Sequence, residues 1–148
     1  MTDLLIQFLF AVFATCGFSI IFRVPVRNLP ICALVGACGW IVYQLLVSNE
    51  FSPVAACFFA SSMVTLLSDI ASKLLKEAST VFIIPGIMCL VPGAGMYRCM
   101  LALLHHDMNS FASIGTETLL VAGAIAVGLL VMGSLIKVLR LGIKNFIS

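Results

Sequence analysis

One basic side chain lies inside a long apolar stretch of this sequence, close to residues that interrupt helices. The stretch runs from Val81 to Leu104 (VFIIPGIMCLVPGAGMYRCMLALL), and its charged residue is Arg98. Arginine presents a planar fork of donors that matches a carboxylate. A half-helix that begins after Pro92 and Gly93 would direct free N–H groups and a positive dipole end at an anion. We therefore predict a site for a small anion, with the alternative that Arg98 extends to the membrane interface or satisfies loosened backbone carbonyls.

Two Pro-Gly pairs interrupt this stretch. Proline lacks a backbone donor and clashes with the carbonyl four residues before it, so it kinks or breaks a helix. In lipid, the freed carbonyl must be buried in protein or face a wet cavity. Broken membrane helices of this kind form the substrate sites of transporters. We therefore predict that the stretch lines a solute path. Its candidate path residues are Pro85, Gly86, Pro92, Gly93, Gly95, Tyr97 and Arg98.

A second candidate group is a polar stripe one segment earlier. Its members recur at steps of three and four residues, so they share one face of a helix. They are Ser62, Thr65, Asp69, Ser72, Lys73 and Lys76. A carboxylate inside a membrane span costs at least about 2.5 kcal/mol and normally faces the bundle interior or water. Two interpretations remain open: Asp69 is a proton or cation site on the path with Ser62 and Thr65, or it lies near the interface and pairs with Lys73 at i+4.

The other reactive residue types form no catalytic or metal-binding pattern. His105 and His106 are adjacent and would point in different directions on a helix, so we assign residues 105–117 to a solvated outer loop; zinc binding and proton sensing are the alternatives. The six cysteines all lie in apolar stretches without metal-type spacing, which is typical of packing residues. No nucleophile and base are paired at membrane depth. We therefore predict that the protein is not an enzyme and binds no metal or cofactor.

Apolar helices must position these side chains. The chain has 148 residues, of which 62% are hydrophobic and only 9% charged. A soluble domain of this size could not bury so many apolar side chains. The charge-free intervals are each close to the ~20 residues that a helix needs to cross ~30 Å of hydrocarbon. We predict an all-α integral membrane protein with one transmembrane domain, residues 1–148. Its five spans lie at about 4–22, 29–47, 53–74, 81–104 and 118–139, the fourth of them broken at Pro-Gly.

The basic residues indicate how the helices are oriented, because lysine and arginine collect in cytoplasmic connections. The N-terminus, the second connection and the fourth connection have none. Seven lie in the other connections and at the C-terminal end: Arg23, Arg27, Lys73, Lys76, Lys137, Arg140 and Lys144. We predict that the N-terminus is outside and the C-terminus is in the cytoplasm. The net charge of +2 gives no indication of nucleic-acid binding.

The residues also resemble a known family. The run from Gly17 to Trp40 (GFSIIFRVPVRNLPICALVGACGW), the broken fourth stretch and the five-span layout resemble the threonine/serine exporter family. The similarity is closest to the small subunit of its split, two-component form, which is known from a succinate exporter. The Val-Pro-Val-Arg turn and the pattern Val-Pro-Gly-x-x-x-Tyr at Val91 to Tyr97 are the most recognisable parts. The resemblance implies a multi-pass plasma-membrane exporter of succinate, threonine or serine, driven by the proton-motive force.

The same resemblance implies a partner. In fused members of the family, a larger half with five spans of its own precedes a half like this one. The implied partner is therefore a larger five-span subunit, and a half that begins inside and crosses five times ends outside, in agreement with the orientation above. The alternative is a self-assembling homo-oligomeric channel, which the small residues of the second and fifth spans would also permit. The resemblance supplies no functional residues, so the candidate path rests on side-chain chemistry alone.

Overall fold

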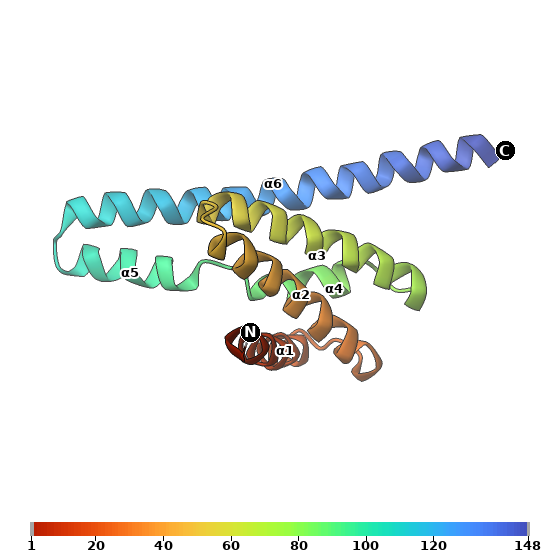
Figure 1. The fold of residues 1–148 in the computed structure, drawn as a ribbon, viewed down its shortest axis with the longest axis horizontal. Helices are drawn as coiled ribbons and strands as arrows, with labels where there is room; N and C mark the ends of the chain where they lie inside the picture. The colour runs from red at the N-terminus through yellow and green to blue at the C-terminus, as the bar shows by residue number, and fades with distance from the viewer. Residues whose placement is uncertain (1, 148) are drawn as a thin grey trace.

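A computed structural model describes the backbone of residues 2–147 and the side chains of residues 4–140 and 142 (Figure 1). The described residues form helices and turns, with no strand among them. The helices are α1 (Thr2–Ile21), the short 3-10 helix η1 (Val26–Asn28), α2 (Leu29–Ser48), α3 (Pro53–Leu75), α4 (Thr80–Met88), α5 (Gly93–Leu104) and α6 (Met108–Ile147). The prediction of an all-α protein is confirmed.

Four of these helices are long and apolar enough to cross a membrane. They are α1, α2, α3 and α6, and α4 with α5 forms a pair bent by 50° that can be counted as a fifth, broken span. Local signals set several boundaries. The Ser52 hydroxyl caps α3 by accepting the Ala55 N–H at 3.3 Å. Pro53 occupies the first turn of α3, where a backbone N–H would have no partner within the helix and its absence costs nothing. The structure therefore agrees with a multi-pass membrane protein whose fourth span is broken.

The break occurs at one Pro-Gly pair and not at two. Helix α4 continues through Pro85 and Gly86 and ends at Met88, so the predicted break at the first pair is wrong. Pro85 cannot donate to the carbonyl of Val81, four residues earlier. That carbonyl instead accepts from the Cys32 thiol of α2, with sulfur and oxygen 3.6 Å apart. Because α2 supplies the missing donor, α4 stays helical around a fully buried proline.

The predicted outer loop at residues 105–117 is mostly helix. Only a short turn joins α5 to α6, which begins at Met108 and therefore starts ten residues before the predicted fifth span. Asp107 stabilises this start, because its Oδ1 accepts the Ser110 N–H at 3.1 Å. With 40 residues, α6 is about 60 Å long at 1.5 Å per residue. Glu117 is therefore held on a helix that packs against α5.

The Asp107 cap makes the start of α6 sensitive to acid. Hydrogen bonds from the Ser110 hydroxyl and N–H lower the pKa of Asp107 below its ordinary value. The cap therefore stabilises the helix above the ordinary carboxyl pKa and is lost as the pH falls through the lowered one. Asp107→Ala should accelerate hydrogen–deuterium exchange at the start of α6 at neutral pH, and the difference from wild type should vanish in acid. Asp107→Asn keeps the cap without titrating, so acid should change its exchange no more than that of a distant helix.

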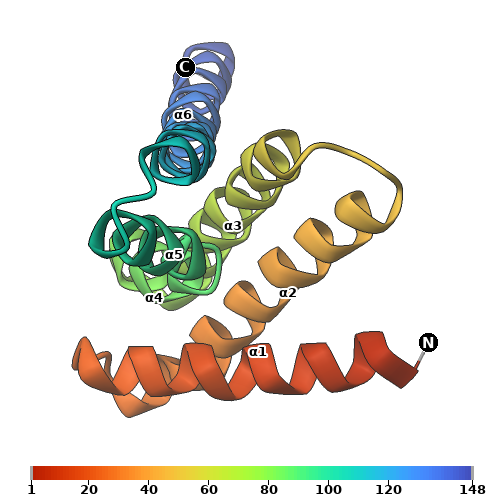
Figure 2. The same cartoon turned by 90° about the vertical axis from the view of Figure 1, so that its left-hand side faces the viewer.

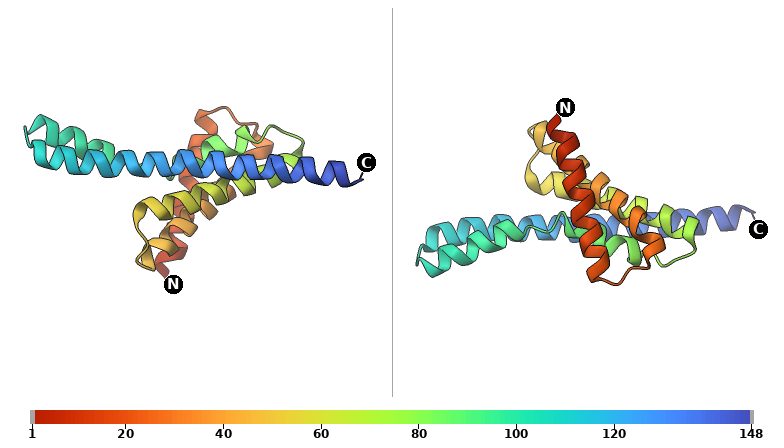
Figure 3. Two further views of the ribbon diagram at one scale, coloured as in Figure 1. Left: turned by 90° about the horizontal axis from the view of Figure 1, so that it is seen from above. Right: turned by 90° about the horizontal axis from the view of Figure 1, so that it is seen from below.

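The helices pack around α3, which contacts α2 and α4 on one side and α6 on another. The buried residues at this junction are Val35, Cys57, Ala60, Val64, Leu90, Val121 and Ile125. Helix α1 crosses the outside of α2 and α4 at a steep angle, as Figure 2 shows. Helix α5 and the first part of α6 run side by side and project together away from the rest, while the remainder of α6 runs along α3 (Figure 3). The α4–α5 break therefore lies where this hairpin leaves the bundle.

Small residues permit the closest helix contacts. A Cβ added at Gly36 of α2 would collide with the Thr15 side chain of α1, and one added at Gly128 of α6 would collide with the Ser61 hydroxyl of α3. Close approach of this kind stabilises helix packing in lipid, where the hydrophobic effect between helices is absent. At these two contacts, small residues of α2 and α6 therefore serve the packing of helices within the chain.

Candidate functional site

A cavity of about 380 Å³ lies at the α4–α5 break. Five segments enclose it: α2, the start of α3, the turn after α4, α5 and α6. The lining residues are Trp40, Tyr43, Pro53, Cys57, Cys89, Leu90, Val91, Pro92, Gly93, Ala94, Gly95, Arg98, Ile114, Glu117, Thr118 and Val121. The volume is in the range of small-molecule sites. We call it the polar cavity, because it contains an arginine and a glutamate.

The break directs the start of α5 into this cavity. Pro92 precedes the helix, and no side chain caps its first turn. The first N–H groups of a helix have no intrahelical partner, and they carry the positive end of its dipole. Gly93, Ala94 and Gly95 line the cavity and leave its wall without bulky side chains. This part of the wall is therefore suited to a negatively charged group.

Two opposite charges line the same cavity. Arg98 comes from α5, about one turn after the break, and Glu117 comes from α6. Among the side chains that the structure describes, neither of them forms an ion pair or a hydrogen bond with another residue. Gly95 allows the two helices to approach, since a Cβ there would press on the Thr118 side chain. The polar cavity therefore offers one cation and one anion to a ligand.

An aromatic pair forms another wall. The rings of Trp40 and Tyr43 lie with centroids 5.5 Å apart and planes tilted by 38°. Aromatic side chains of this kind are usually found at a membrane interface, so their residue types did not mark them as cavity residues. An aromatic face attracts an ammonium group, and the Tyr43 hydroxyl can donate or accept a hydrogen bond.

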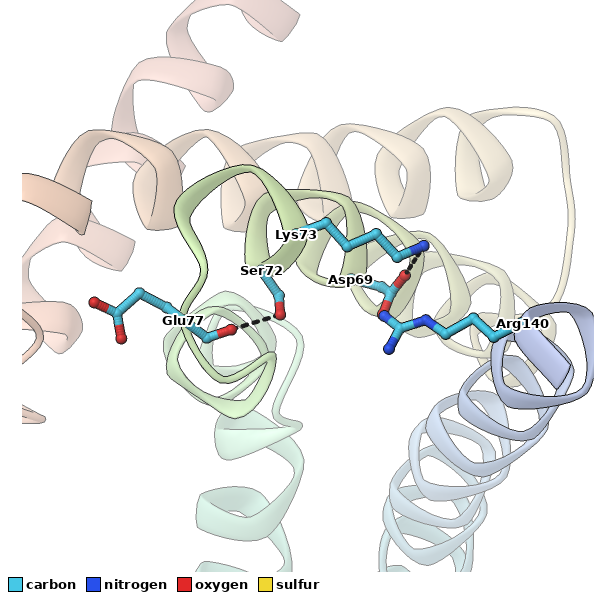
Figure 4. Close-up of polar contacts among 5 residues, drawn as sticks. All are labelled: Asp69, Ser72, Lys73, Glu77 and Arg140. Atoms are coloured by element: carbon cyan, nitrogen blue, oxygen red, sulfur yellow. Dashed lines mark hydrogen bonds and ion pairs between the residues drawn. The ribbon is translucent and has the colours of Figure 1, made fainter. Parts of the chain in front are cut away.

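The predicted carboxylate Asp69 belongs to a separate ion cluster (Figure 4). Asp69 is only 7% exposed, its Oδ2 lies 2.9 Å from the Lys73 Nζ, and its Oδ1 pairs with Arg140 of α6. The i+4 pair with Lys73 is therefore confirmed. The side chain of Glu77 points away from this cluster, while its backbone carbonyl accepts the Ser72 hydroxyl at 2.6 Å. The cluster joins α3 to α6 and does not line the polar cavity.

Some of the other predicted path residues line the polar cavity, and the rest lie elsewhere in the structure. Four of them line the polar cavity: Pro92, Gly93, Gly95 and Arg98. Pro85 and Gly86 are buried against the bundle, and Tyr97 is 69% exposed on α5. Ser62 and Thr65 are buried on α3 and donate to backbone carbonyls of their own helix, at 2.8 Å in each case.

Sequence reasoning missed Glu117 and Thr118 because it placed them at a loop boundary. The signal that marks them is Asp107, a capping residue ten positions earlier that starts a helix and brings both onto it. Among the residues whose side chains the structure describes, 4–140 and 142, no group of three His, Cys, Asp or Glu side chains is assembled. His105 and His106 are both exposed in the short turn.

Comparison with known proteins adds a family match. A family model described as "Threonine/Serine exporter, ThrE" matches residues 7–135. An uncharacterized protein of Haemophilus influenzae is 31% identical over 143 residues, which cover 91% of this chain and 48% of that protein. The chain thus spans about half the length of this relative. No solved structure matches.

Proposed function

The chain belongs to the threonine/serine exporter family, and on that premise we propose that it is a membrane subunit of a secondary exporter of small carboxylates or hydroxy amino acids. The solute binds in the polar cavity at the α4–α5 break. The observation that carries this proposal is the joint presence of Arg98, the uncapped start of α5 and Glu117 around one cavity.

The pair of charges favours an amino acid over a dicarboxylate. Arg98 and the start of α5 would hold the carboxylate, through a fork of charged donors and free N–H groups. Glu117 would hold the ammonium group, with the rings of Trp40 and Tyr43 as apolar and cation-attracting walls. Succinate has a carboxylate at each end, so Glu117 would repel one of them. Threonine and serine are therefore the solutes that this cavity fits best.

Removing the negative charge at Glu117 should change the selectivity. We expect Glu117→Gln to reduce threonine efflux at least roughly tenfold, since a hydrogen bond to a charged group contributes about 1.5–3 kcal/mol and about 1.4 kcal/mol is a factor of ten. Succinate efflux should rise relative to threonine efflux, because a repulsive charge is gone. The measurement is efflux of both labelled solutes from cells with equal amounts of protein in the membrane. Glu50→Gln, at the exposed turn between α2 and α3, is the matched control.

A second protein half would complete the path. Arg98 and Glu117 are both largely exposed at the cavity, and charged side chains in a membrane normally face protein or water. The Haemophilus relative is about twice as long as the matched region, which leaves room in it for a further set of helices. The partner we propose is a larger five-span subunit of the same family. The alternative partner is a second copy of this chain, which would pack against the first through small residues.

The test is efflux of labelled threonine, serine and succinate from cells with this chain alone, with a larger five-span member of the family alone, and with both. Efflux only from cells with both chains would support the two-subunit exporter and identify the solute. Efflux with this chain alone would favour the homo-oligomer. No efflux from any of them, with both proteins present in the membrane, would contradict the exporter proposal for these solutes.

A further inference from the structure

The ion cluster of Asp69, Lys73 and Arg140 carries more positive than negative charge. Two cations share one carboxylate, and among the side chains that the structure describes neither cation has a second acidic partner. The side chain of Asp69 is only 10% exposed, whereas those of Lys73 and Arg140 are 55% and 50% exposed. An ammonium group has three N–H donors and a guanidinium group has five. The surplus positive charge therefore lies on the surface and keeps donors for a further acceptor.

A third basic side chain adds to this charge. Lys137 precedes Arg140 by three residues on α6, so the two side chains are neighbours on the surface of the helix. Lys137 is exposed, and within the described part of the chain it forms no ion pair. The acidic side chain next along the sequence from Asp69, that of Glu77, points away from the ion cluster (Figure 4). Three cations, offset by one carboxylate, therefore lie on this part of α3 and α6.

These cations lie where two apolar spans end. The span of α3 ends at Leu75, and that of α6 ends at Arg140. The ends of membrane spans are at the level of the lipid head groups, where lysine and arginine attract anionic lipids. Exposed apolar side chains adjoin the cations on both helices: Ile70, Leu74, Leu135, Val138 and Leu139. The charged groups are therefore bordered by surface that suits hydrocarbon.

A shallow cavity of about 360 Å³ extends this apolar surface along α6. It is lined by Leu130, Val131, Ser134, Leu135 and Val138, which we call the α6 strip. Their spacing of one, three and four residues places them on one side of the helix, over about 12 Å at 1.5 Å per residue. Lys137 follows Leu130 by seven residues, so it continues the same side of α6. An apolar strip that ends in positive charge is complementary to an acyl chain joined to an anionic head group.

We propose that Lys73, Lys137 and Arg140 bind the phosphate of one anionic phospholipid, and that an acyl chain of this lipid lies in the α6 strip. All three cations are exposed, so a lipid of the surrounding bilayer reaches them directly. Asp69 holds two of them in place before the lipid binds, which lowers the cost of ordering long side chains. Because the phosphate contacts both α3 and α6, the bound lipid joins these helices a second time, beside the ion pairs of Asp69.

The test is lipid binding by the full chain in detergent. Phosphatidylglycerol or phosphatidylcholine with the same acyl chains is added stepwise, and native mass spectrometry gives the Kd of the first bound lipid. We expect the wild type to bind phosphatidylglycerol at least tenfold more tightly than phosphatidylcholine. Lys137→Gln, which breaks no ion pair, should weaken phosphatidylglycerol binding about fivefold, the effect of one basic residue near an anionic lipid surface. Lys73→Gln with Lys137→Gln should remove most of the preference and leaves the Asp69–Arg140 pair in place.

Two double variants separate this site from overall charge. Arg23→Gln with Arg27→Gln removes as many positive charges from exposed positions between α1 and α2, and it should keep the preference. Lys73→Arg with Lys137→Arg keeps both charges and should bind like wild type. Equal losses in the two glutamine pairs would overturn the proposal, because anionic lipid would then be attracted only by the net charge of the chain.

Two further outcomes would also overturn the proposal. One is equal binding of the two phospholipids by the wild type. The other is displacement of phosphatidylglycerol by an equal concentration of inorganic phosphate, since the acyl chain would then contribute nothing and a free anion would be the occupant. None of these measurements depends on transport, so their outcome stands apart from the exporter proposal.

Discussion

Arg98→Ala is expected to abolish export while the protein still inserts into the membrane. Arg98 is the cation of the polar cavity, and a hydrogen bond to a charged group contributes about 1.5–3 kcal/mol. Its loss should weaken solute binding by roughly 10–100-fold, at about 1.4 kcal/mol per factor of ten. The measurement is efflux of labelled threonine in the presence of the larger subunit, normalised to the amount of this chain in the membrane.

Two further variants make the Arg98 result specific. Arg98→Lys keeps the charge and loses the planar fork, so it should retain part of the export. Arg27→Ala removes an exposed arginine from η1 and should export like wild type, which controls for the loss of one positive charge. Normal export by a well-inserted Arg98→Ala protein would show that the solute does not use the polar cavity.

Gly128→Ile is expected to be the most destabilising single change in the bundle. Even one added Cβ at Gly128 would overlap the Ser61 hydroxyl and come within 2.7 Å of the Phe58 carbonyl oxygen. Both atoms belong to α3, and the backbone of that helix cannot move without disturbing α2 and α4. Overpacking of this kind costs typically 1–3 kcal/mol, and we expect about 3 kcal/mol here because the opposing atoms include backbone. The measurement is thermal unfolding of the protein in detergent.

Gly123 provides the matched control on the same helix. A Cβ at Gly123 meets nothing within 4 Å, and the residue is exposed. Gly123→Ile should therefore unfold at about the wild-type temperature. If both variants lose the same stability, the cause is isoleucine in α6 itself and not the α3–α6 contact.

Features that depend on nearby residues could be predicted from the sequence. The bounds of α1, α2 and α3 follow from hydrophobic runs, and the Asp69–Lys73 pair follows from i+4 spacing. The second ion pair of Asp69 was missed, because Arg140 lies 71 positions away and no helical period connects the two. The continuity of α4 through Pro85 was missed for the same reason, since the rescuing thiol of Cys32 comes from another helix.

The candidate site was predicted in part. The break at Pro92 and the charge at Arg98 are both local features, and the structure places them together. Glu117, Trp40 and Tyr43 reach the same cavity only because α2 and α6 pack beside the break. Glu117 lay in the predicted loop, and aromatic side chains such as Trp40 and Tyr43 are most often found at a membrane interface. The packing of α2 and α6, which depends on residues far apart in the sequence, is what brings these three side chains to the polar cavity.

The contact at Gly128 lies midway along α6 between the two charged regions of the molecule. Glu117 of the polar cavity is about 17 Å from it along the helix, and Arg140, which binds Asp69, is about 18 Å from it in the other direction. If α6 tilts as a rigid body about this contact, the two charged regions move by nearly equal distances. A tilt of about 10° would move each end by about 3 Å, in opposite directions. A tilt of α6 that opens the polar cavity would therefore also displace Arg140 relative to Asp69. The geometry of the cavity and that of the ion pair would then change together, although the two regions do not touch.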